Sequence, residues 1–166
     1  DFSKLNIVGS DGSGIAGLSD EVGKNKVNLG WEFYGWAIIK ALQDGYDLNY
    51  MPLADLDNRL DYYTPVIITN KKMIEKNSDT VKKFMEATKK GYEYAIDHPS
   101  KAAEILHEDA LSDTDLKFLK ESQKYLSSQY AKDADSWGVM KDSVWDNYTD
   151  FMYETGLISQ KIDAKD

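Results

Sequence analysis

Four aromatic side chains fall within the six residues from Trp31 to Trp36. Aromatic rings offer flat faces on which planar molecules stack, and small-molecule pockets are commonly lined in this way. We therefore expect Trp31, Tyr34 and Trp36 to stack against a planar ligand, with the carboxylate of Glu32 as a polar contact. The alternative is that these rings belong to the hydrophobic core, which is the commoner place for any one of them taken alone.

A second polar and aromatic group occurs at Asp61-Tyr-Tyr-Thr-Pro65. Successive side chains of an extended segment point to opposite sides, so only one of the two tyrosines is expected to face a cleft. A tyrosine hydroxyl and a carboxylate can orient a polar ring by hydrogen bonds. Asp61 and Tyr63 are therefore candidate ligand contacts. The alternative is an ordinary entrance to a strand, with Pro65 fixing the backbone.

Other patterns that could support chemistry are weak. The stretch Gly9–Gly14 has neither the lysine of a phosphate-binding loop nor the spacing of a dinucleotide-binding loop. His98 and His107 do not have a metal-ligand spacing, and the chain contains no cysteine. The spacing suggests no set of nucleophile, base and orienting residue. We expect no catalytic residue, no metal and no cofactor.

Composition limits the classes of partner. The chain has 166 residues, 20 of them basic and 29 acidic, and its net charge is −9. Binding to a nucleic acid backbone requires a basic surface, so this balance argues against it, and it disfavours anionic lipid surfaces for the same reason. Arg59 is the only arginine, which nearly excludes bidentate arginine clamps on phosphates or carboxylates. A small, neutral or weakly charged partner fits this composition best.

The first part of the chain has an α/β pattern. Short apolar runs rich in branched residues predict strands at Leu5–Val8, Val27–Trp31 and Val66–Thr69. A helix is predicted from Tyr34 to Leu42, ended by Gly45. Strands that alternate with helices are typical of an α/β fold. We therefore predict an α/β fold with a sheet of few strands followed by a helical segment.

From Asn77 onward the chain is predicted to be helical. Apolar residues recur every three or four positions between Asn77 and Pro99, which indicates an amphipathic helix. Further helices are predicted to start near Ser100, Ser112 and Asp142. Three strands are few for a doubly wound sheet. We therefore expect the chain to be the carboxyl-side part of a larger two-lobe protein, and the alternative is a complete small α+β domain.

Several segments together resemble a known family. These are the aromatic segment 31–36, the stretch 61–70, the long stretch 80–103 with its Tyr-Ala-Ile-Asp-His-Pro ending, Trp145 and the closing Met-x-x-x-Gly-Leu-Ile158. They are similar to the NMT1/THI5-like substrate-binding proteins of ABC importers, whose members include binders of thiamine pyrimidine precursors. The resemblance implies a fold like that of the type II periplasmic binding proteins, of which this chain would supply only the second half.

The resemblance also implies a domain division. Residues 1–57 would be part of the second lobe, 58–70 a crossover strand, 71–158 a helical segment packed on the first lobe, and 159–166 a tail. Where pyrimidine-binding members carry Asn-Trp-Glu, this chain has Gly35-Trp36-Ala37. The implied ligand is therefore a small planar heterocycle, with a thiamine pyrimidine precursor as one candidate.

The implied role is transport. The chain would work outside the cytoplasm, lipid-anchored or periplasmic with its signal outside this sequence, and would deliver its ligand to the membrane subunits of an ABC importer. A truncated chain would associate with itself through its unpaired sheet edge. Two other functions stay open. One is a pyrimidine-synthesising enzyme of the THI5 type, which uses a histidine and a cysteine-rich motif, and the other is a helical interaction domain without a small ligand.

Overall fold

The computed structural model describes Lys4, residues 29–132, residues 134–163 and Lys165. The chain divides into two compact units. Unit 1 comprises Asp1–Leu48 and His98–Ser127, and unit 2 comprises Asn49–Asp97 and Ser128–Asp166. Each unit therefore combines an earlier and a later part of the chain.

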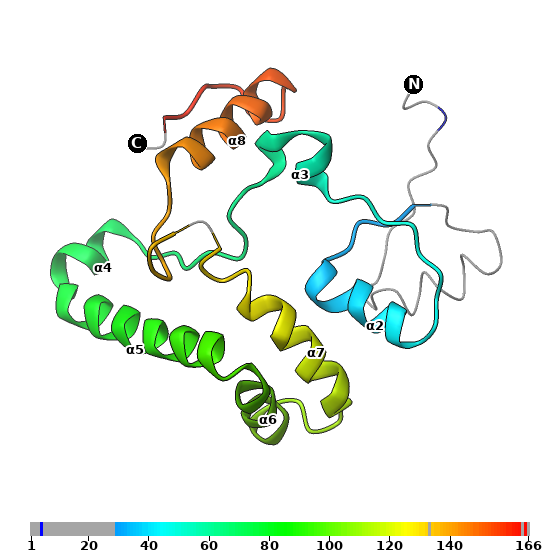
Figure 1. The fold of residues 1–166 in the computed structure, drawn as a ribbon. Helices are drawn as coiled ribbons and strands as arrows, with labels where there is room; N and C mark the ends of the chain where they lie inside the picture. The colour runs from blue at the N-terminus through cyan, green and yellow to red at the C-terminus, as the bar shows by residue number, and fades with distance from the viewer. Residues whose placement is uncertain (1–3, 5–28, 133, 164, 166) are drawn as a thin grey trace. The chain divides into compact units, whose positions relative to one another are not determined.

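The regular elements of the described residues are helical (Figure 1). In unit 1 they are the π-helical turn η2 (Tyr34–Ile38), α2 (Ile39–Gln43), α6 (Pro99–Asp109) and α7 (Leu116–Ser127). In unit 2 they are α3 (Leu53–Leu56), the 3-10 turn η3 (Asn58–Leu60), α4 (Lys71–Lys76), α5 (Ser78–Asp97) and α8 (Asp142–Glu154). Within the described part of each unit, no strand pairs with another segment.

The predicted α/β fold is therefore wrong for the described residues. The segment 66–69 has irregular backbone, and no backbone hydrogen bond joins it to another described segment. A strand exists only through the hydrogen bonds of a ladder, so branched residues alone do not make one. Ile68 is 85% exposed. Of Val27–Trp31, the described residues 29–31 are also irregular, and Leu5–Val8 lies outside the described residues.

The predicted helices are confirmed, with changes at two starts. Pro99 occupies the first position of α6, where its missing N–H costs nothing, so Ser100 is not the cap. Asp115 caps α7, because its Oδ1 accepts a hydrogen bond of 2.7 Å from the N–H of Phe118. Gly45 adopts φ of 85° just after α2, as the prediction of a helix ended by glycine requires.

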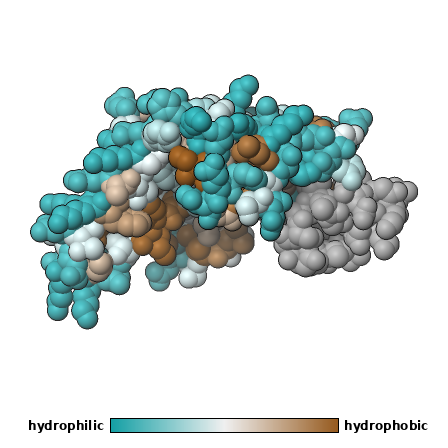
Figure 2. All heavy atoms as spheres, turned by 90° about the horizontal axis from the view of Figure 1, so that it is seen from below, coloured by the Kyte–Doolittle hydropathy of each residue, from teal (hydrophilic) through white to brown (hydrophobic). Residues whose placement is uncertain are grey.

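The most buried apolar side chains of the described residues lie in unit 1. One cluster joins Ala103 of α6 to Phe118 and Leu119 of α7, and a smaller one surrounds Ala37 and Ala41. In unit 2 the described contacts include ring pairs, ion pairs and hydrogen bonds, and α5 has no buried residue. Apolar side chains consequently remain visible between hydrophilic ones on the surface drawn in Figure 2.

No described helix combines the length and the apolar character that crossing a lipid bilayer requires. The predicted boundaries of lobes, crossover and tail stay predictions.

Candidate functional site

The aromatic segment of unit 1 enters a helix through an unusually wide turn. The N–H of Ile39 donates a hydrogen bond to the carbonyl of Tyr34, five residues earlier, which is the spacing of a π-helix. The turn η2 then continues directly into α2. Its two small residues, Gly35 and Ala37, are buried. Widened helical turns of this kind occur frequently at functional sites.

One face of α7 contacts three consecutive residues of η2. The ring of Tyr125 lies 4.6 Å from the ring of Tyr34, tilted by 47°. The ring of Phe118 lies 4.7 Å from that of Trp36 in an edge-to-face arrangement. The contacting residues of α7 recur at spacings of four and three, which places them on one side of the helix.

Between these two ring pairs, α7 also contacts the backbone of Gly35. The buried Ser122 donates a hydrogen bond of 2.5 Å from its Oγ to the Gly35 carbonyl. A Cβ atom at Gly35 would lie 2.7 Å from Cδ2 of Leu126 and 3.3 Å from Cδ1 of Tyr125. A side chain at this position would therefore force its neighbours to move, so glycine permits the close approach of turn and helix.

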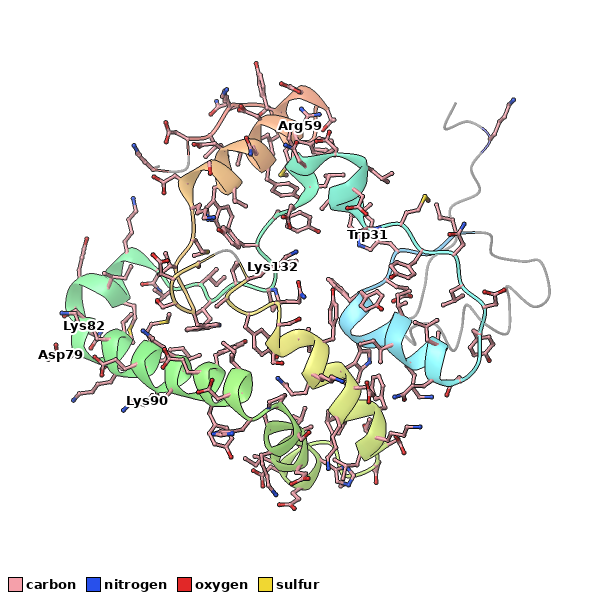
Figure 3. All side chains as sticks on the ribbon, in the orientation of Figure 1. Trp31, Arg59, Asp79, Lys82, Lys90 and Lys132 are labelled. Atoms are coloured by element: carbon pink, nitrogen blue, oxygen red, sulfur yellow. The ribbon has the colours of Figure 1, made fainter. Side chains whose placement is uncertain are left out.

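The predicted stacking residues differ in how much of each ring is accessible. Trp31 is 71% exposed and Trp36 is 45% exposed, whereas Tyr34 and Glu32 are half-buried. Figure 3 labels Trp31 on the segment that leads into η2. These exposed fractions argue against the alternative that Trp31 and Trp36 are core residues of unit 1. Tyr34 mainly packs on α7.

Phe33 was not among the predicted site residues, yet it is 64% exposed beside Trp31 and Trp36. A signal for it was present in the sequence. Alternate residues of an extended segment share one side, and Phe33 follows Trp31 by two positions. Unit 1 thus presents several accessible rings within one short segment.

Asp61 and Tyr63, the other predicted contacts, belong to unit 2, where Tyr63 packs on α8. Its ring lies 6.0 Å from that of Trp145, and its hydroxyl oxygen accepts a hydrogen bond of 2.9 Å from the N–H of Lys141. Tyr62 stacks on Tyr148 at 4.3 Å. Asp61 is exposed just after η3. That these residues share a site with the aromatic segment stays a prediction.

Arg59 has a structural role that sequence reasoning missed. Its guanidinium pairs with the carboxylate of Asp57 at 2.7 Å and with that of Glu154 at 2.5 Å, and it lies 5.2 Å from the ring centroid of Phe151. Hydrogen bonds from Arg59 lower the pKa of Asp57 to about 2, and those to Asp57 and Glu154 raise the pKa of Arg59. Figure 3 shows Arg59 near α8. The only possible signal was its position two residues after Asp57.

Neither unit offers a metal site within its described residues, because no three histidine or carboxylate side chains there come together as a ligand set. The aromatic segment offers stacking faces, apolar contact and one carboxylate that can accept hydrogen bonds. Small-molecule pockets are commonly lined by such groups.

Comparison with protein families shows a match over more than half of the chain. The family model described as NMT1/THI5 like matches residues 1–102, which include the aromatic segment and the stretch 61–70. No curated protein matches the chain.

Proposed function

This chain belongs to the NMT1/THI5-like family, and on that premise we propose that it is the solute-binding component of an ABC importer. Its ligand in this proposal is a small planar heterocycle, with an aminopyrimidine precursor of thiamine as the first candidate. The observation that supports it best is the exposure of Trp31 and Trp36 on a segment that α7 contacts at three consecutive residues.

Exposed aromatic rings favour a ligand that covers them. Neighbouring apolar side chains left in water are typical of binding surfaces, and a stacked ring pair contributes about 0.5–1.5 kcal/mol beyond burial. Glu32 lies within the same segment and can accept hydrogen bonds from an amino group. The net charge of −9 also favours a neutral or cationic ligand over an anion.

We propose binding without catalysis. The enzymatic alternative relies on a histidine and a cysteine-rich motif, and the sequence contains no cysteine. His98 precedes α6 and the Nδ1 atom of His107 lies 3.1 Å from the carbonyl of Leu111, so both belong to the α6 region rather than to the aromatic segment. The remaining part of the proposal places the protein outside the cytoplasm, where it delivers its ligand to the importer's membrane subunits.

Calorimetric titration of the full chain with the aminopyrimidine precursor of thiamine tests this function. We expect binding of the wild type and a loss of affinity of about tenfold in Trp31→Ala, because a stacking face is removed. Trp137→Ala is the matched control, since Trp137 stacks on Tyr92 in unit 2 at 4.3 Å. A flat titration of the wild type across planar heterocycles would contradict the proposal.

Chromatography of the ligand after incubation separates binding from turnover. We expect the heterocycle to be recovered unchanged. A new product that forms in proportion to protein and time would replace the binding proposal by the enzymatic one.

A further inference from the structure

We infer that Ser122 and Gly35 are positioning residues, which fix the orientation of the Trp36 ring before any ligand arrives. The expected effect on ligand affinity rests on the proposed function. The orientation of the Trp36 ring depends only on how α7 contacts η2, so it can be tested without a ligand.

The first step is the order of contacts along α7. Tyr34 meets Tyr125, Gly35 meets Ser122 and Trp36 meets Phe118. Residue numbers therefore increase along η2 and decrease along α7, so the two segments run in opposite directions where they touch. Contacts at three successive residues leave the turn little freedom to rotate about its axis or to slide along α7.

The second step is the central position of the hydrogen bond. Ser122 is 3% exposed and its Oγ donates to the carbonyl of Gly35, midway between the two ring pairs. A buried carbonyl is destabilised when it loses a hydrogen-bond donor, because no water replaces that donor. Rotation of η2 away from α7 would break this bond, so other orientations of the turn are less stable than the observed one.

The third step concerns the ring that a ligand would meet. In an edge-to-face pair, one ring directs its edge at the face of the other. The pair with Phe118 fixes the tilt of the Trp36 ring, yet 45% of Trp36 remains exposed. A ring held in one orientation loses less conformational entropy when a ligand stacks on it, which raises affinity.

Fluorine NMR of the full chain labelled with 5-fluorotryptophan tests the structural part. The chain has four tryptophans, so single Trp→Phe variants assign the four signals. In Ser122→Ala we expect the Trp36 signal to shift or broaden, while the signals of Trp137 and Trp145 stay unchanged. Ser127→Ala is the matched control, because the Ser127 hydroxyl bonds the Lys124 carbonyl within α7 itself.

The same variants then test the consequence for binding. With the aminopyrimidine precursor of thiamine as probe, Ser122→Ala should weaken affinity about threefold to tenfold, the equivalent of one hydrogen bond, and Ser127→Ala should not. Ser122→Thr keeps the hydroxyl and should restore the Trp36 signal.

Two results would overturn the inference. One is a Trp36 signal identical in the wild type and in a folded Ser122→Ala variant. The other is unchanged affinity in Ser122→Ala despite a changed signal. A wild type that binds no heterocycle would contradict the proposed function instead, and the fluorine spectra would still decide whether Ser122 positions Trp36.

Discussion

The hydroxyl oxygen of Tyr63 accepts a hydrogen bond from the backbone N–H of Lys141, the residue immediately before α8. The first N–H groups of a helix have no partner within the helix. No side chain at the Lys141 position caps α8. A tyrosine 78 residues earlier in the chain thus satisfies a donor at this helix start.

Replacing Tyr63 by phenylalanine should therefore destabilise unit 2. We expect the free energy of unfolding to fall by about 1 kcal/mol, the net value of one hydrogen bond, in urea unfolding followed by circular dichroism. Tyr153→Phe, at an exposed position of α8, is the control and should change little. Unchanged stability combined with weaker ligand binding would instead support the ligand contact predicted from the sequence.

Gly35→Ala should disturb η2 through sterics alone. Its Cβ would meet Cδ2 of Leu126 at 2.7 Å, and overpacking of this kind costs about 1–3 kcal/mol. Leu126→Ala removes the obstructing atoms, so the double variant should be more stable than the sum of the two single changes predicts. Strictly additive unfolding energies in the four-member cycle would show that this contact is not what excludes a side chain.

Glu104 gives the stability of unit 1 a dependence on pH. Hydrogen bonds from Lys101 and Lys120, at 2.7 and 2.6 Å, lower its pKa from 4.5 to about 2. Because the folded state favours the charged carboxylate, the stabilisation is complete above pH 4.5 and is lost as the pH falls toward 2. The melting temperatures of the wild type and Glu104→Gln should thus converge over this interval. A difference that stays constant would contradict the assignment.

Arg59→Lys should lower the melting temperature although the charge is kept. Lysine cannot reproduce the planar fork that pairs with Asp57 and Glu154. The pKa of Asp57 should return from about 2 toward its ordinary value of 3.8, which NMR titration can follow. Lys89→Arg, in an exposed pair with Glu93 at 3.5 Å, is the control. Equal melting temperatures in all three proteins would show that the fork is dispensable.

The sequence predicted helices better than strands because of the range of the interactions involved. The spacing of apolar residues in α5 and the glycine after α2 act within a few residues, so they can be recognised locally. The strand predicted at Val66–Thr69 requires a partner that no local pattern supplies.

The sequence predicted the aromatic residues of the candidate site but not the contacts with α7 that hold them in place. The aromatic cluster is visible in the sequence, whereas the contact of Ser122 with Gly35 joins residues 87 apart. One signal was present, since Ser122 interrupts an apolar face of α7 between Phe118 and Tyr125. A small hydroxyl on such a face indicates a backbone carbonyl nearby, yet it does not say which one.

The exposed segment Val66–Ile68 has a consequence for handling the protein. Short branched stretches with open amide groups are templates for fibril growth when many copies meet. Pro65 directly precedes this segment, and the positively charged Lys71 and Lys72 follow it in the sequence. Proline removes an N–H donor and like charges repel, so both features oppose stacking of identical chains. Concentrated salt weakens charge repulsion, so dilute storage at low ionic strength preserves the dissolved protein best.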